Sequence, residues 1–166
     1  MSKVGETTLV LDLSALEHNY NYLRSKIEPT TKFLGVVKAF AYGSDMVAIA
    51  QKLEQLGADY LAVAYASEGV LLRQAGIKLP ILVLHPLASN FDDLIAYCLE
   101  PSLYSKNILK QFLKAAEAQK QKQYPVHIKF NTGLNRLGFA QTDVDFIEEA
   151  ITKSTSVKIV STFSHL

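Results

Sequence analysis

The sequence has little of what several large classes of protein require. Its 166 residues include a single cysteine, Cys98, so no disulfide can form within the chain and no zinc site built on several cysteines is available. Basic and acidic residues nearly cancel, at 17 and 16, which argues against a surface made for nucleic acid or anionic lipid. No apolar run approaches the roughly 20 residues of a membrane span. We therefore expect neither a nucleic acid nor a membrane as partner.

The common short motifs of enzyme sites are also missing. The chain has no Walker-type phosphate loop, no glycine triplet of the dinucleotide-binding kind and no serine elbow. Its four histidines are scattered, and none lies at i, i+4 spacing from another, so we expect no metal site. Residues 1–13 carry acidic side chains and short apolar runs, unlike a signal peptide. Together with the single cysteine, this favours the cytoplasm.

What the chain does have is an alternation of short apolar segments with longer segments of helical period, which is typical of parallel βα units. A hydrophobic content of 49% is enough for a sizeable core. We predict strands near residues 33–37, 60–64, 81–84, 101–104, 126–130 and 158–163. Six units fit either an open doubly wound sheet or an incomplete eight-unit barrel, which needs about 250 residues. Periodicity does not choose between these.

The helical segments carry ordinary start and stop signals. Ser14, with Glu17 three residues later, predicts a capping box at the start of the first helix, and Pro29 lies just beyond its expected end. Gly57 and Gly76 are expected to end two later helices, since glycine readily adopts the left-handed conformation that closes a helix.

Lys38 is the first candidate for chemistry, because it ends an almost wholly apolar segment and a loop follows it. Strand ends are where α/β proteins place reactive groups. Partial desolvation there lowers the pKa of a lysine and suits it to Schiff-base chemistry with a carbonyl. Taken alone, a lysine in this position more often extends its ammonium into water. Tyr42, four residues later, could reach a phosphate through its hydroxyl or cap the core with its ring.

A second candidate segment runs from His127 to Phe139 and joins a strand to a loop with two glycines. Alternation places His127, Lys129 and Asn131 on one face of the strand. In a barrel that face would bury the Lys129 ammonium, which would then need a partner. An edge strand with one face in water is the simpler alternative. His165, near the end of the chain, could donate, accept or stack, although a structural histidine is more common.

Several motifs, in their order and spacing, resemble alanine racemase along nearly the whole chain. They are Val36-Val37-Lys38-Ala39-Phe40-Ala41-Tyr42-Gly43, Tyr60 to Ala64 with Glu68, Leu72 to Ile77, Pro80 to Leu84, Lys129 to Phe139, and Ser164-His165-Leu166. The lysine motif and the Thr-Gly-x-x-Arg-x-Gly segment are the most specific. The resemblance implies a fold type III pyridoxal-phosphate enzyme. We therefore expect residues 1–166 to form an α/β domain, a partial TIM (β/α)8 barrel of about six βα units. A short N-terminal strand and helix should precede these units, and the family's C-terminal β domain should be absent.

The resemblance also implies roles for individual residues. The family lysine that binds pyridoxal 5'-phosphate covalently and acts as one of two proton-transfer bases matches Lys38. The arginine that hydrogen-bonds the cofactor's phenolic oxygen matches Arg136, and both are the predicted catalytic residues. Lys129 matches a lysine that orients this arginine and is often carbamylated in relatives. Tyr42 should hold the phosphate and His165 should pack on the pyridine ring. The predicted cofactor-binding residues are thus Lys38, Tyr42, Leu84, Arg136 and His165.

The implied activity is the interconversion of L-alanine and D-alanine for cell-wall peptidoglycan by a homodimer. The second base in this family is a tyrosine from the C-terminal β domain of the other subunit, so residues 1–166 alone should be inactive. Two alternatives remain. One is a pyridoxal-phosphate barrel protein of the same group that is not a racemase, such as a cofactor carrier or a decarboxylase-like relative. The other is a purely structural domain. Selectivity for alanine over serine stays open.

The sequence departs from the family pattern at a few positions near these motifs. Phe40 stands where asparagine is usual, Ser44 and Asp45 replace a Gly-His or similar pair, Asn131 replaces aspartate, and Leu134 replaces methionine. We expect these changes to affect loop packing more than the implied roles, and Phe40 to alter the shape of the substrate side.

Overall fold

The computed structural model describes residues 7–165, and a single curved sheet of six strands forms its centre. The strands are β1 (Leu34–Val36), β2 (Tyr60–Val63), β3 (Ile81–Val83), β4 (Glu100–Leu103), β5 (Tyr124–Phe130) and β6 (Val157–Ser164). Each pairs in parallel with the next one in the chain. A doubly wound sheet reverses its strand order at one point, whereas this order runs straight through from β1 to β6. The fold is therefore part of a (β/α)8 barrel, as predicted.

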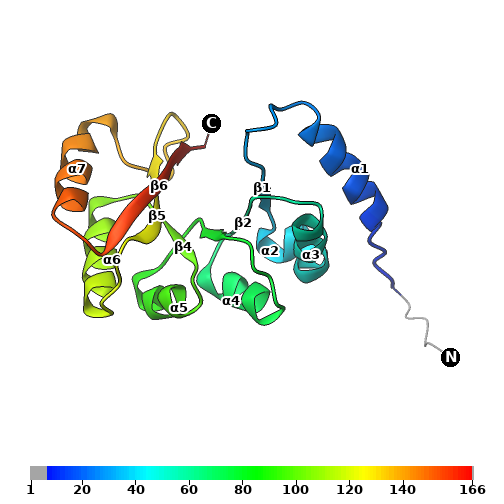
Figure 1. Cartoon of the computed structure of the whole chain (residues 1–166), viewed down its shortest axis with the longest axis horizontal. Helices are drawn as coiled ribbons and strands as arrows, with labels where there is room; N and C mark the ends of the chain where they lie inside the picture. The colour runs from blue at the N-terminus through cyan, green and yellow to red at the C-terminus, as the bar shows by residue number, and fades with distance from the viewer. Residues whose placement is uncertain (1–6, 166) are drawn as a thin grey trace.

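Helical segments alternate with the strands along the chain. They are α1 (Leu13–Arg24), α2 (Lys38–Gly43), α3 (Met46–Gln55), α4 (Ala66–Gln74), α5 (Phe91–Ala96), α6 (Lys106–Ala118) and α7 (Val144–Thr152), with 3-10 turns η1 (Ala88–Asn90) and η2 (Gln141–Asp143). In Figure 1 the helices α3 to α7 follow the convex side of the sheet, while α1 lies beyond the β1 end. No helix within residues 7–165 is long and apolar enough to cross a membrane.

All six predicted strands are present, with ends shifted by at most two residues. Gly57 and Gly76 have φ of +84° and +89° and follow the ends of α3 and α4, as predicted. The alternative of an edge strand for β5 is wrong, because β4 and β6 pair with its two sides. Its polar inner face therefore lies inside the barrel.

The start of the chain differs from the prediction. Asp12, not Ser14, caps the first helix, since its carboxylate accepts hydrogen bonds from the amides of Ser14 and Ala15 at 2.9 Å. Glu17 instead forms an ion pair with Lys52 of α3 at 2.5 Å. The part of the predicted N-terminal strand that falls in residues 7–12 is not a strand. A strand needs a neighbour to pair with, and Val10 is 81% exposed.

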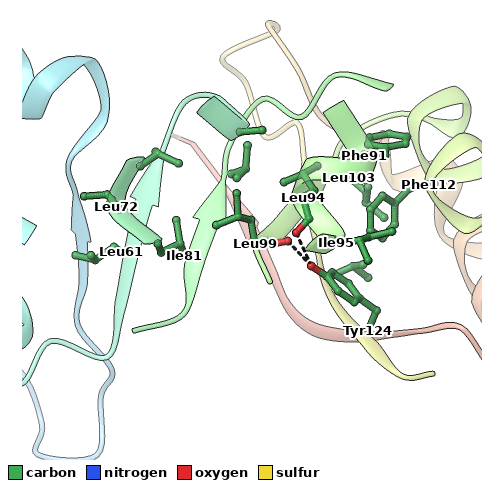
Figure 2. Close-up of a cluster of buried hydrophobic side chains, with 14 of the residues drawn as sticks. Leu61, Leu72, Ile81, Phe91, Leu94, Ile95, Leu99, Leu103, Phe112 and Tyr124 are labelled. Carbon is green, nitrogen blue, oxygen red and sulfur yellow. Dashed lines mark hydrogen bonds between the residues drawn. The ribbon is translucent and has the colours of Figure 1, made fainter. Parts of the chain in front are cut away.

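The apolar core lies between the sheet and its outer helices. Leu61 and Ile81 project outward from their strands onto Leu72 of α4 and the residues around it (Figure 2). Gly69 allows a close approach here, since a Cβ at that position would lie 2.8 Å from a methyl of Leu99. Alternation along each strand sends the other side chains to the concave face, and the polar residues gather there.

Candidate active site at the carboxyl ends of the strands

The concave face of the sheet holds a cavity of about 990 Å³. Its described lining residues include every residue singled out for a cofactor or supporting role, namely Lys38, Tyr42, Leu84, Lys129, Arg136 and His165. Lys38, Leu84 and His165 each follow the end of a strand, and Lys129 is the penultimate residue of β5. These side chains therefore gather at the carboxyl end of the barrel, where barrel enzymes place their active sites.

Lys38 opens a turn of unusual backbone conformation. The four residues after it, Ala39 to Tyr42, all have φ between +51° and +61°, so α2 is a single left-handed turn. None of the four is glycine, and a left-handed residue with a Cβ costs roughly 1–2 kcal/mol. Such conformations persist only where the surroundings impose them, and they cluster at functional sites.

Contacts within the loop hold part of this turn. The amide of Ala41 donates to the carbonyl of Val37 at 3.0 Å, and the Ser44 hydroxyl donates to the carbonyl of Ala41 at 2.8 Å. Asp45 caps α3 by accepting from the amide of Ala48 at 3.0 Å. Ser44 and Asp45, which depart from the family pattern, thus have local structural roles. Tyr42 is 69% exposed, so the alternative in which its ring caps the core is wrong.

Glu68 connects this turn to the next strand. One carboxylate oxygen accepts from the amide of Ala39 at 2.6 Å. The other accepts from the amides of Ala64 and Tyr65, at 2.7 and 3.1 Å, at the start of α4. In the sequence, Glu68 belongs to one of the family motifs, but no role was predicted for it. Its position near the start of a helix is compatible with a helix cap, and its contact with Ala39 at the end of the neighbouring strand cannot be read from the sequence.

Lys129 is the most buried of the lysine and arginine residues that line the cavity. It is 6% exposed, and no hydrogen bond or ion pair joins its side chain to another residue in the described range. Burial, with the positive charges of Arg136 and Lys38, lowers the pKa of the Lys129 ammonium. Among the described lining residues none is Asp or Glu. Lys129 lines the cavity, where an anion bound inside would pair with its ammonium.

A closed loop returns Arg136 to the cavity after β5. The Asn131 side chain accepts from the amide of Asn135 at 2.9 Å, and the Phe139 amide donates to the Lys129 carbonyl at 2.8 Å, which closes the loop. Gly138 is required at the closure. It has φ of +143°, and a Cβ there would lie 2.4 Å from the Asn131 nitrogen.

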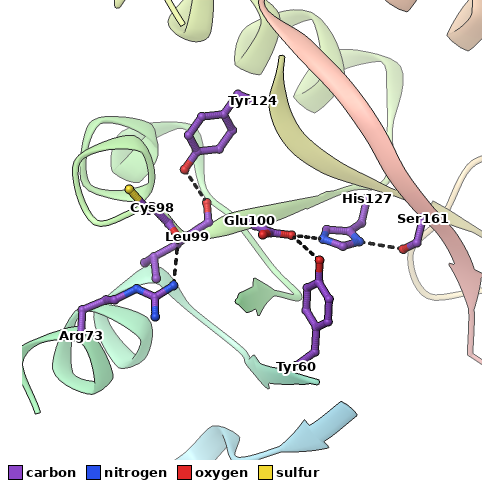
Figure 3. Close-up of polar contacts among 8 residues, drawn as sticks. All are labelled: Tyr60, Arg73, Cys98, Leu99, Glu100, Tyr124, His127 and Ser161. Carbon is purple, nitrogen blue, oxygen red and sulfur yellow. Dashed lines mark hydrogen bonds and ion pairs between the residues drawn. The ribbon is translucent and has the colours of Figure 1, made fainter. Parts of the chain in front are cut away.

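A buried polar network lies on the same concave face, between β2, β4, β5 and β6 (Figure 3). His127 contacts Glu100 at 2.8 Å through Nε2 and Ser161 at 2.7 Å through Nδ1. The Tyr60 hydroxyl donates to the same Glu100 carboxylate at 3.2 Å. Burial, followed by the charge of Glu100 and this hydrogen bond, raises the pKa of Tyr60 to about 12. His127 therefore shares its strand face with Lys129 but has partners of its own.

Sequence reasoning missed a row of rings at the rim of the cavity. His85 stacks on Tyr104 with ring centroids 5.5 Å apart and meets Tyr65 edge-on at 5.6 Å. Tyr65 and His85 also line the cavity. Each of the three residues lies one or two positions beyond a strand end, and that position was the available signal.

Six parallel strands in sequential order, with a cavity at their carboxyl ends, define the class of (β/α)8 barrel domains. The comparisons with known proteins then specify the family. The model of the family described as alanine racemase, N-terminal domain, matches residues 11–166. This chain therefore belongs to that family.

Individual relatives agree with this assignment. Alanine racemase from Sorangium cellulosum (strain So ce56) is 33% identical over 96% of this chain and 44% of its own length, and that from Clostridium kluyveri is 38% identical over 93% and 40%. The structure of alanine racemase from Clostridium difficile 630 matches with a TM-score of 0.86 at 34% identity, over 93% of this chain and 41% of that one. A structure of that racemase in complex with cycloserine matches with a TM-score of 0.85. The chain thus spans about two fifths of the length of these relatives.

Proposed function

We propose that this chain supplies the cofactor lysine and the N-terminal part of the active site of a pyridoxal-phosphate-dependent alanine racemase. The observation that carries the proposal is the grouping of Lys38, Lys129 and Arg136 around one cavity at the strand ends, with no carboxylate in its described lining. Family membership and the racemase relatives support the same function.

The residues present fit pyridoxal 5'-phosphate. The cofactor carries a phosphate and a phenolic oxygen, both of which suit a cavity lined by cations. We propose that Tyr42 and its loop hold the phosphate, that Arg136 donates to the phenolic oxygen, and that Leu84 and His165 contact the ring. Lys38 would hold the cofactor covalently. A carbamate on Lys129 would place a negative charge beside Arg136 and Lys38, and would satisfy a side chain that otherwise lacks a partner.

The cofactor, when bound, delocalises the negative charge left on the α-carbon after its proton is removed. The chain's own residues then have three tasks. Lys38 moves the proton at one face of the α-carbon, Arg136 fixes the cofactor by its charge, and Lys129 keeps Arg136 in place. Racemisation also needs a base on the opposite face. We propose that a tyrosine from a C-terminal β domain of a second subunit supplies it, so that the active protein is a cytoplasmic homodimer. Residues 1–166 alone would then be inactive, and the product D-alanine would serve peptidoglycan synthesis.

The test uses the protein produced from its full natural reading frame. It is incubated with pyridoxal 5'-phosphate, reduced with borohydride and analysed by mass spectrometry for a pyridoxyl group on Lys38. Lys38→Ala should remove this group and lower alanine racemisation on the order of 10³-fold, which lies within the range for loss of an acid–base group. Lys114→Ala, which changes an exposed lysine of α6, is the matched control and should change neither.

The same assay separates the alternatives. Exchange of the α-proton of L-alanine for deuterium, with formation of D-alanine, supports a racemase. Loss of carbon dioxide from an amino acid would indicate a decarboxylase-like relative, and a pyridoxyl-lysine without turnover would indicate a cofactor carrier. Tight cofactor binding that survives Lys38→Ala would contradict the assignment of the lysine.

A further inference from the structure

The structure points to Glu68 as a positioning residue for Lys38. The hydrogen bond from the Ala39 amide to the Glu68 carboxylate fixes the peptide unit that leaves Lys38, because that amide belongs to the same plane as the Lys38 carbonyl. The direction of this plane sets ψ of Lys38. Glu68 thereby helps to fix the backbone from which the lysine side chain extends.

The contact comes from another element of the barrel. Across residues 7–165, Glu68 is the one side chain outside the loop 37–45 that hydrogen-bonds to the backbone of α2. The bonds within the loop involve Val37, Phe40, Ala41 and Ser44, and none of them reaches the amide of Ala39. The left-handed turn that begins at Ala39 is therefore tied to the remainder of the barrel at its first residue.

An ordinary helix cap does not account for this geometry. A capping glutamate needs only the amides at the start of its own helix, and one oxygen of Glu68 already binds those of Ala64 and Tyr65. The second oxygen crosses to the end of β1. A charged carboxylate accepts stronger hydrogen bonds from amides than a neutral group does, so its negative charge strengthens the bonds from all three amides.

We propose that this bridge between the ends of β1 and β2 holds Lys38 in the orientation needed for proton transfer. The proposal rests on the function proposed above, in which Lys38 moves the proton. A misplacement of about 1 Å at a reacting group can cost on the order of 10²-fold in rate. Loss of the bridge should therefore lower kcat and leave KM nearly unchanged, since the lysine is retained and only its placement is altered.

The experiment compares two substitutions with a matched control in the full-length protein. Glu68→Gln keeps the size of the side chain, but its amide nitrogen cannot accept, so one side of the bridge is lost. Glu68→Asp keeps the charge at the start of α4 but is too short to span both ends. Glu54→Gln is the control for the loss of a carboxylate charge, because one oxygen of Glu54 also accepts from two backbone amides, those of Lys78 and Leu79, away from the cavity.

Two readouts are measured for each variant. Hydrogen exchange of the peptide containing Ala39, followed by mass spectrometry without cofactor, should become at least tenfold faster in both Glu68 variants and stay unchanged in Glu54→Gln. With cofactor, kcat should fall about 10- to 100-fold in both Glu68 variants, with KM within about threefold of the wild type. Should Glu68→Gln fail to fold, Glu68→Asp provides the same comparison.

The possible failures are distinguishable. If the wild type racemises alanine but the Glu68 variants match it in exchange and in kcat, the positioning role is wrong. An equal fall in kcat in Glu54→Gln would also overturn it, since the effect would then be general destabilisation. If the wild type binds no cofactor and has no racemase activity, the proposed function fails. In that case the exchange measurement still decides whether Glu68 holds the Ala39 amide.

Discussion

At the scale of single residues, the ionisation of Lys129 links the stability of the folded protein to pH. Its pKa is lowered by burial and by Arg136 and Lys38, so the folded protein favours the neutral amine more than the unfolded chain does. Below the lowered pKa the lysine is charged in both states, and its cost to stability is present in full. That cost shrinks as the pH rises through the lowered pKa towards the unfolded value of about 10.4.

We therefore predict that, in the cofactor-free protein, Lys129→Met is more stable than the wild type at pH 7, and that this difference in stability narrows as the pH rises towards 10. Urea unfolding at a series of pH values measures both effects. Lys114→Met serves as the exposed control and should keep the wild-type slope. A slope that is the same in Lys129→Met and in the wild type would show that Lys129 is not the group responsible.

Arg73 illustrates a different use of charge, because its guanidinium binds backbone carbonyls and no carboxylate in the described residues. It donates to the carbonyls of Ile77 and Leu79 at 2.8 and 2.7 Å, and to that of Tyr97 at 3.1 Å. It also donates to the carbonyl of Cys98 at 3.1 Å (Figure 3). These bonds join the end of α4 to the segments that lead into β3 and β4. One side chain thus holds in place the two segments that precede β3 and β4.

We predict that Arg73→Met lowers the free energy of unfolding by about 2–4 kcal/mol, since several partly buried carbonyls lose a charged donor. The measurement is denaturant unfolding of the cofactor-free protein. Arg24→Met is the comparison, because Arg24 also donates to two carbonyls, those of Pro29 and Thr31, but at an exposed site. Its loss should cost about 1 kcal/mol or less. Equal effects of the two substitutions would argue against a special role for Arg73.

At the scale of elements, the loop that carries Arg136 depends on one glycine. Gly138 occupies a region of backbone conformation that costs other residues about 1–3 kcal/mol, and its Cα faces the backbone of Phe130 and Asn131. We predict that Gly138→Ala opens the loop, lowers stability by about 1–3 kcal/mol and weakens cofactor binding at least tenfold. Gly76→Ala, at a left-handed helix end with open space around it, should lower stability without weakening cofactor binding. Cofactor titration by absorbance and thermal unfolding measure the two effects.

The local pattern of apolar and turn residues was enough to predict the strands, but not the backbone conformations that complete the site. Segments such as β2 and β3 are apolar and bounded by turn residues, so their existence follows from the sequence. The left-handed turn after Lys38 is not predictable in this way, because Ala, Phe and Tyr disfavour it and one of the bonds that hold it comes from Glu68, which is distant in sequence. The pairing of Glu100 with His127 is likewise invisible, since it arises only when β4 lies beside β5. The gathering of six predicted residues at one cavity is observed, while their chemical roles stay predictions.

At the scale of the whole molecule, the sheet has two outer strands. Within residues 7–165, β1 pairs only with β2 and β6 only with β5. Val36 on β1 and Val160 on β6 are 39% and 43% exposed. Unpaired strand edges seek further strands. We predict that a polypeptide limited to residues 1–166 self-associates, and that Val160→Lys raises the dissociation constant at least tenfold. Sedimentation over a concentration series measures this, and a monomer at every concentration would contradict it.

The order of the strands also bears on how the chain is made. Within residues 7–165, each strand after β1 pairs with the one synthesised just before it, so β2 to β6 do not wait for a distant partner to leave the ribosome. Each new βα unit can add to an edge that already exists, and closing short loops costs less entropy than closing long ones. The Lys38 turn and Glu68 emerge within the first two units, and their contact can form while most of the barrel is still unmade. The geometry around Lys38 can therefore be set early, before the segments that contain Lys129 and His165 have been translated.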